Sequence, residues 1–173
     1  MRSTTDGYDP RELRRALGAF PTGVTVVTTV RPDGSFVGLT CNSFNSLSLD
    51  PPLILWSIVS SSSSVSAFNQ ASHFAINILS EDQAAISRQF ASKVPDKFAG
   101  LELQTGESGV PLIAGCSAYL ECRTHSRLQL GDHVLIIGQV ERFRHHDELP
   151  PLFFYSGKYL SAGAESAGVG TIT

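Results

Sequence analysis

The sequence predicts a mainly β protein whose strands form a closed or nearly closed barrel. Six or seven apolar segments rich in β-branched residues are separated by turn residues or by short helical segments. These segments do not alternate regularly with helices, and no GxGxxG motif of a Rossmann domain occurs. The 173 residues, 42% hydrophobic and 17% charged, contain enough apolar material for one domain with a core.

Helices are expected at three places. The Asp9-Pro10 pair combines a capping residue with proline at the first helical position and opens a helix that should run to about Gly18. The Ser-x-x-Gln spacing over 80–83 is that of a capping box and opens a helix that should end near residue 90. One or two further helical turns are expected over 65–68.

Strands are expected where β-branched and aromatic residues run between turn signals. The turn Arg31-Pro32-Asp33-Gly34 should join the first two strands as a hairpin, because proline presets φ and glycine accepts a positive φ. The polar stretch 38–49 should begin as a strand and end as a loop, and 91–108 should be mostly loop. The expected strands cover residues 22–30, 35–41, 53–58, 73–79, 118–127, 133–145 and 152–155. Segments 1–8 and 161–173 are expected to be flexible, which leaves 9–160 as the domain.

Composition excludes several classes of function. A net charge of −3 and a pI near 5.9 argue against nucleic-acid binding. No apolar run approaches the roughly 20 residues that span a bilayer, and the N-terminal sequence has no hydrophobic signal region. The odd set Cys41, Cys116 and Cys122 lacks metal-ligand spacing and predicts buried free thiols. We therefore expect a cytoplasmic protein without disulfides or a membrane anchor.

Hydrolase and metal chemistry are also disfavoured. The sequence contains no GxSxG nucleophile elbow and no Walker A phosphate loop. His145 and His146 are adjacent in an expected strand, so their side chains should point to opposite faces. The sequence therefore predicts no metal site.

The stretch GLTCNSFNSLSL, residues 38–49, is the most informative polar feature. Its uncharged hydrogen-bonding side chains alternate with apolar ones, and they suit the edge of a flat ligand rich in carbonyls and ring nitrogens. These side chains include Thr40, Asn42, Ser43, Ser46 and Ser48.

Two segments offer a place for phosphate. Ser60–Ser64 is a run of five serines between an expected strand and an expected helix start. It is either a flexible linker or an anion site made of hydroxyls and backbone N–H groups. Lys93 and Lys97 lie in a polar loop and are either solvated surface charges or point charges that close over such an anion.

The tripeptide Gly131-Asp132-His133 precedes a β-branched strand. Gly-Asp commonly makes a turn, so His133 should stand where the strand leaves that turn. It is either a histidine that packs or hydrogen-bonds at a strand end or a residue that meets a ligand.

Taken in order, these segments resemble the flavin reductase family with the FMN-binding split barrel, which contains the reductase components of two-component flavin-dependent monooxygenases. The resemblance covers about residues 11–160. It is carried by LRRALGAFPTGVT over 13–25, the Thr-x-x-Ser-Phe-x-Ser-x-Ser-x-Asp-Pro-Pro pattern within 38–52, and the segments 60–68, 90–98, 131–133 and 155–159. It implies a Greek-key split β-barrel with a few short flanking helices.

The resemblance also implies roles for particular residues. Thr40, Cys41, Asn42 and Ser43 would contact the isoalloxazine ring or the ribityl chain, with Ser46 and Ser48 nearby. Ser61, Ser62, Ser63 and Ser64 would bind the flavin phosphate, with Lys93 or Lys97 closing over it. His133 would place the nicotinamide, and Tyr155 and Lys158 would line the site from a subunit interface. The chain departs from common family forms at Cys41 and Asn42, where alanine or serine is frequent.

The implied activity is hydride transfer from NADH or NADPH to FMN or FAD. The cofactors carry this chemistry, which agrees with the missing catalytic dyad. The resemblance further implies a homodimer that supplies reduced flavin to a separate oxygenase. The residues alone leave two alternative functions open. One is a flavin-binding redox module without turnover, and the other is a flavin-dependent oxidase of the same barrel fold that acts on a bound small substrate.

Overall fold

The computed structural model describes Gly7 and residues 9–161. Apart from Gly7 and Ser161, the segments 1–8 and 161–173 lie outside these described residues. The helices are α1 (Pro10–Leu17), α2 (Val65–Gln70), η2 (Glu81–Gln83) and α3 (Ala84–Ala91). The strands are β1 (Thr22–Gly23), β2 (Thr25–Val30), β3 (Phe36–Cys41), β4 (Asn45–Leu49), β5 (Pro52–Val59), β6 (His73–Ile78), β7 (Leu103–Thr105), β8 (Pro111–Ile113), β9 (Ala118–Leu130), β10 (His133–His145), β11 (Phe153–Tyr155) and β12 (Lys158–Leu160).

Local signals account for the helix starts. Asp9 Oδ1 accepts a hydrogen bond from Arg11 N at 2.8 Å and caps α1. The capping box of Ser80 and Gln83 is present before α3, so both predicted starts are confirmed. The predicted hairpin is confirmed as well: β2 pairs antiparallel with β3, and Gly34 has φ of +83° in the turn between them.

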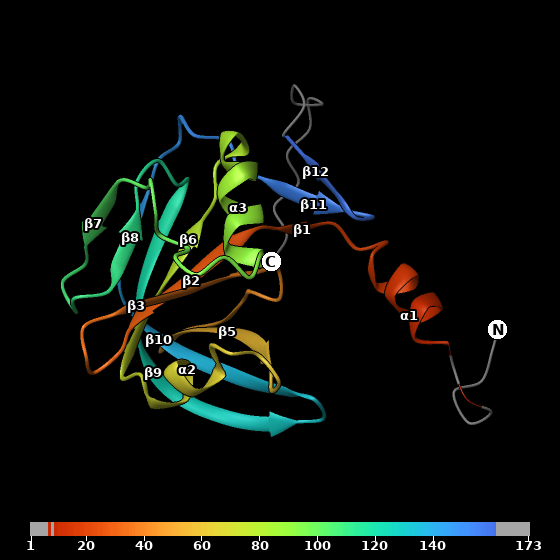
Figure 1. The fold of residues 1–173 in the computed structure, drawn as a ribbon, viewed down its shortest axis with the longest axis horizontal. Coiled ribbons are helices and arrows are strands. Elements are labelled where there is room, and N and C mark those ends of the chain that lie inside the picture. The colour runs from red at the N-terminus through yellow and green to blue at the C-terminus, as the bar shows by residue number, and fades with distance from the viewer. Residues whose placement is uncertain (1–6, 8, 162–173) are drawn as a thin grey trace.

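One seven-stranded antiparallel sheet forms the barrel, with the order β3-β2-β6-β9-β10-β5-β4 (Figure 1). β3 and β4 follow one another in the chain but lie at opposite edges of this sheet. Residues 42–44 therefore cross from one edge to the other. Ser43 links this crossing segment to β5. Ser57 N donates to Ser43 Oγ at 2.9 Å, and Ser43 Oγ donates to Ser57 O at 3.2 Å.

Two apolar clusters fill the structure. Inside the barrel, Trp56 packs edge-on against Phe68 and Phe74, with ring centroids 4.9 and 5.7 Å apart. The second cluster lies beneath α3 and includes the fully buried Phe90. Phe90 leaves no room for a side chain at position 38, because a Cβ on Gly38 would lie 2.5 Å from its ring. This close contact seats α3 on β3.

Two strand predictions were wrong. The stretch 38–49 does not end as a loop, because Asn45–Leu49 forms β4 and pairs with the open edge of β5. The expected strand 22–30 is interrupted at Val24. There β1 pairs with β11 in a separate three-stranded sheet, whereas β2 belongs to the barrel. Both differences come from pairing between segments distant in the sequence. The short strands β7, β8 and β12 were not predicted, and β9 extends to Leu130, beyond its predicted end.

Candidate functional site

The end of β3 carries the polar residues that were predicted to contact a flat ligand. Thr40 Oγ1 donates to Ser87 O on α3 at 2.6 Å, so this hydroxyl ties the strand to the helix. Cys41 is buried, and its Sγ lies 3.0 Å from Ser43 Oγ. Asn42 is exposed, so it is the residue of this set that presents its side chain to solvent.

Asn42 faces a broad hollow of about 740 Å³ between α1 and the β11–β12 hairpin. The hollow is both basic and apolar. Its lining includes Arg14, Arg15, Phe20, Thr22, Phe154 and Ser156. The Thr22 hydroxyl oxygen is buried and has no partner among the described residues. Tyr155 and Lys158, both exposed, pair with each other on the same hairpin.

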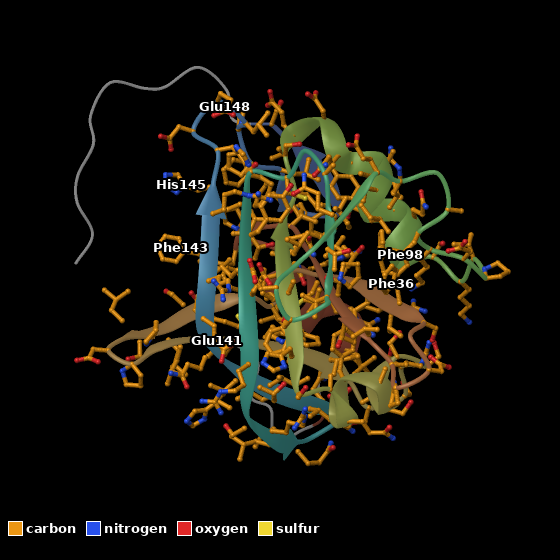
Figure 2. All side chains as sticks on the ribbon, turned by 90° about the vertical axis from the view of Figure 1, so that its left-hand side faces the viewer. Phe36, Phe98, Glu141, Phe143, His145 and Glu148 are labelled. Carbon is orange, nitrogen blue, oxygen red and sulfur yellow. The ribbon has the colours of Figure 1, made fainter. Side chains whose placement is uncertain are left out.

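Ser46 and Ser48 do not line the hollow that Asn42 faces. They line a second, largely apolar groove of about 370 Å³ together with Phe44, Leu49 and Phe143. Phe143 and His145, which Figure 2 shows on the outer side of β10, both line this groove. Because the chain crosses the barrel between Asn42 and Asn45, the predicted polar residues face two different hollows of one subunit.

The serine run makes a tight turn that leads into α2. Ser62 N donates to Val59 O at 2.9 Å, and Ser64 N donates to Ser62 Oγ at 3.2 Å. Ser64 is buried and takes the N-cap position of α2, whereas Ser61 is exposed. The run is therefore an ordered turn between β5 and α2.

The serine turn meets the lysine loop at one cleft of about 180 Å³. Ser63, Ser64 and Lys97 line it together, although the serines and the lysine are far apart in the sequence. Phe36 and Phe98 pack at the same place, with ring centroids 5.6 Å apart (Figure 2). Lys93 is exposed in the same loop.

Two cations belong to this cleft. Lys97 Nζ donates to Phe90 O at 2.7 Å, and burial lowers the pKa of this amine. Arg31 also lines the cleft, with one guanidinium nitrogen 3.3 Å from Ser35 Oγ. Asp96 opposes them there, with its carboxylate accepting from Phe98 N at 2.9 Å. Sequence reasoning missed Arg31, because its place before Pro-Asp-Gly marked it only as a turn residue.

The turn that carries His133 lies against the serine turn. Ser60 N donates to Asp132 O at 2.8 Å, which extends the pairing of β5 with β10 by one hydrogen bond. His133 Nδ1 lies 2.7 Å from Asp132 Oδ1, and 46% of the histidine side chain is exposed. The hydrogen bond from His133 and the electrostatic attraction of the same side chain lower the pKa of Asp132.

The two ends of the predicted site are well separated within one subunit. Figure 1 shows the turn between β9 and β10 at the lower edge and the β11–β12 hairpin at the upper edge. His133 therefore does not meet Tyr155 or Lys158 of the same chain. His145 and His146, which lie outside this region, contact Asp147 and Glu148 separately, each at 3.4 Å. No grouping of three or more potential metal ligands occurs among the described residues.

A family model described as a flavin reductase like domain matches residues 17–163. The chain belongs to this family. SmoA, an FMN reductase (NADH) of Agrobacterium fabrum (strain C58 / ATCC 33970), is 47% identical over 153 residues, which make up 88% of this chain and 86% of SmoA.

Other relatives are longer. The reductase component of the flavin-dependent trigonelline monooxygenase of Acinetobacter baylyi (strain ATCC 33305 / BD413 / ADP1) is 47% identical over 159 residues, or 92% of this chain. This flavin reductase-family chain spans 51% of that relative and 60% of the stachydrine N-demethylase reductase subunit Stc3 of Rhizobium meliloti (strain 1021).

Solved structures confirm the predicted split-barrel fold of this family member. Nitrilotriacetate monooxygenase component B from Mycobacterium thermoresistibile has a TM-score of 0.89 at 39% identity, with 94% of this chain and 92% of that chain covered. The NADH:FAD oxidoreductase SgcE6 of Streptomyces globisporus, solved with NAD and FAD fragments, has a TM-score of 0.88 at 34% identity. That match covers 97% of this chain and 99% of SgcE6. Within the part of the chain that the structure describes, no helix has the length and apolar character to cross a membrane.

Proposed function

We propose that the chain is an NAD(P)H-dependent flavin reductase that reduces FMN or FAD. The observation that carries this proposal is that one strand, β3, connects two hollows that each contain polar side chains. Ser63, Ser64 and Lys97 lie beside Gly38, near its start, and Asn42 lies just past its end. Four residues of strand span about 13 Å, so an elongated ligand laid along β3 would reach both hollows.

A flavin fits this arrangement with its phosphate in the cleft. Lys97 and Arg31 supply positive charge, and the serine turn supplies hydroxyls and N–H groups. The ring would then lie near Asn42. Thr40, Cys41 and Ser43 use their side chains within the fold, so we assign their contacts to the backbone. In this assignment Ser61, Ser62 and Lys93 border the phosphate, and Ser46 and Ser48 lie across the barrel.

His133 is the proposed nicotinamide-positioning residue. Its Nδ1 is held by Asp132, which fixes the ring and leaves Nε2 as the atom that meets the ligand. The reaction passes a hydride from nicotinamide C4 to flavin N5, so NAD(P)H becomes NAD(P)⁺ and the flavin gains two electrons. Hydride transfer leaves the reduced flavin as an anion, and the proton that converts it to the neutral form comes from solvent. The protein supplies position, with the two rings held roughly 3–3.5 Å apart.

We also propose a homodimer. Helix α1 has no buried residue and projects away from the barrel (Figure 1). It and its flanking turn leave Leu17 65% and Phe20 74% exposed, and across the barrel Leu49 is 93% and Phe143 76% exposed. Contiguous exposed apolar patches mark surfaces that bind another molecule. Leu17 and Phe20 line one hollow together, and Leu49 and Phe143 line one groove together. A second copy would also bring Tyr155 and Lys158 to a site that one subunit does not complete.

The proposed setting is the cytoplasm, where the dimer supplies reduced flavin to a separate oxygenase. The trigonelline monooxygenase relative is named as a reductase component, which supports such a partner. Size-exclusion chromatography with light scattering tests the oligomer; a monomer with full activity would contradict the dimer.

The decisive experiment is steady-state oxidation of NADH and NADPH with FMN, FAD or riboflavin as acceptor. We expect turnover that depends on added flavin. Without flavin-dependent oxidation of either nicotinamide, the reductase assignment would be wrong. Peroxide formed only with an added organic substrate would instead indicate an oxidase, and flavin binding without turnover would indicate a redox module.

A further inference from the structure

Gln129 folds back over the turn that carries His133. It lies on β9, opposite Val134 of β10, and the two-residue loop Gly131-Asp132 joins these strands. Its Nε2 lies 3.0 Å from Gly131 O, 3.2 Å from His133 O and 2.9 Å from Ser60 Oγ. One side-chain amide therefore reaches both sides of the loop and the first residue of the serine turn.

These contacts fix the orientation of the amide. Two of the three acceptors are carbonyl oxygens, which cannot donate, so the NH₂ group must face the turn. Asp132 O accepts from Ser60 N at 2.8 Å. Every carbonyl of Gly131, Asp132 and His133 therefore accepts a hydrogen bond, and two of the three bonds come from Gln129.

The loop needs such support. Gly131 has φ of +58°, whereas Asp132 is not among the positive-φ residues, as in a type II′ hairpin turn with glycine first. The loop is exposed, and so is the imidazole that it presents. Asp132 holds the ring to the loop, but a hydrogen bond within the loop cannot hold the loop to the barrel. The backbone of His133 is held to the sheet by its pairing with Val59 and Leu130. Ser60 and Gln129 add hydrogen bonds to the loop itself, from the serine turn and from β9.

We propose that Gln129 is a positioning residue for hydride transfer: it holds the Gly131–His133 turn against the serine turn and so sets where the His133 imidazole meets the nicotinamide. This inference rests on the role proposed above for His133. It adds that the turn proposed for nicotinamide and the serine turn proposed for flavin phosphate are coupled through one side chain. Movement of the loop would spread the imidazole over several positions, and the dinucleotide would bind more weakly.

The test removes the side-chain amide of Gln129 and keeps the length of the side chain. Gln129→Met deletes both N–H donors without adding a charge that could repel the dinucleotide. We expect the NADH KM to rise about five- to tenfold, since all three hydrogen-bond contacts of Gln129 are lost and part of their effect reaches His133. The flavin KM should change less than about twofold, and the melting temperature should change little, because substitutions of exposed side chains rarely alter stability much.

Gln139→Met is the matched control. Gln139 is a glutamine on β10 whose Oε1 accepts from Arg123 at 2.6 Å, and six residues of strand separate it from His133, about 20 Å. The NADH KM of the Gln139→Met variant should stay within about twofold of the KM of the unsubstituted protein. Gln129→Ala repeats the test with a shorter side chain in case the methionine packs in a new way.

A cycle with His133→Ala separates positioning from a general effect. We expect His133→Ala to raise the NADH KM and Gln129→Met to add nothing in that background. Two outcomes would overturn the inference and leave the reductase proposal standing. In the first, Gln129→Met raises the NADH KM equally with and without His133→Ala. In the second, His133→Ala raises the NADH KM but Gln129→Met and Gln129→Ala leave it unchanged. An unchanged KM for His133→Ala would overturn the role of His133 and the inference with it.

Discussion

Replacing Ser43 by alanine removes the side chain that connects the two edges of the barrel. The backbone N–H and C=O of Ser57 face the same way as those of Leu55, which pairs with Asn45 of β4. Beyond Asn45 that ladder has stopped, and Ser43 Oγ bonds both groups of Ser57 instead, at 2.9 and 3.2 Å. The hydroxyl thus stands in for one pair of ladder hydrogen bonds.

The expected cost follows from these two bonds. Each neutral hydrogen bond contributes about 1 kcal/mol, so Ser43→Ala should lower the free energy of unfolding by about 2 kcal/mol. Water can reach the half-buried Ser57, which keeps the cost from rising further. For a chain of this size the melting temperature should fall by about 4–8 °C.

The assay is thermal unfolding followed by circular dichroism with no flavin added, so that ligand contacts do not contribute. Ser66→Ala is the control, because Ser66 is exposed on α2 and its loss should shift the melting temperature by less than about 2 °C. Ser43→Thr keeps the hydroxyl and should recover part of the loss. A melting temperature for Ser43→Ala equal to that of the control would refute the bridging role of Ser43.

Four further outcomes are expected. Gly138→Ala should cost about 1–3 kcal/mol, because a Cβ there would lie 2.5 Å from a buried phenylalanine ring, whereas Gly23→Ala meets nothing within 4 Å; equal melting temperatures would contradict this. Lys97→Met should raise the FMN KM about tenfold and the riboflavin KM much less, because riboflavin lacks the phosphate; equal rises would remove Lys97 from a phosphate site. Burial raises the pKa of Cys116 and Cys122 to about 12, so at pH 8 these two thiols should resist thiol reagents in the native protein, whereas all three cysteines should be labelled once it is unfolded. Since both folded pKa values exceed the ordinary value of 9.0, the stability that these thiols contribute is present below about pH 9 and is lost as the pH rises toward 12, which melting temperatures across that range would measure.

The features predicted correctly from sequence are those with a local cause. The Arg31–Gly34 turn and the capping box at 80–83 each depend on neighbouring residues, and both form as expected. β4 was missed because asparagine and serine have low strand propensity and its stability comes from the edge of β5. The break at Val24 was missed for a similar reason, since only the packed structure shows that β1 pairs with β11.

In the candidate site, too, local features were predictable from sequence and contacts between distant segments were not. The serine run and the lysine loop were recognisable as polar segments, but their meeting at one cleft depends on how α3 sits on β3. Arg31 and Gln129 carried no signal of their own. An arginine before Pro-Asp-Gly is typical of a turn, and a glutamine near a strand end is typical of a solvent-facing position. Their contacts arise from the hairpins that carry them.

A single subunit holds two incomplete halves of the proposed site. One half combines the serine turn with the turn of His133, which Ser60 and Gln129 connect through hydrogen bonds. The other half is the hollow between α1 and the β11–β12 hairpin, where the buried Thr22 hydroxyl has no partner within the described residues and the Phe20 side chain is 74% exposed. The hollow opens along the helix that has no buried residue, so a second copy seated on α1 would cover it. The same contact would then bury the apolar face of α1 and close the hollow beside Asn42.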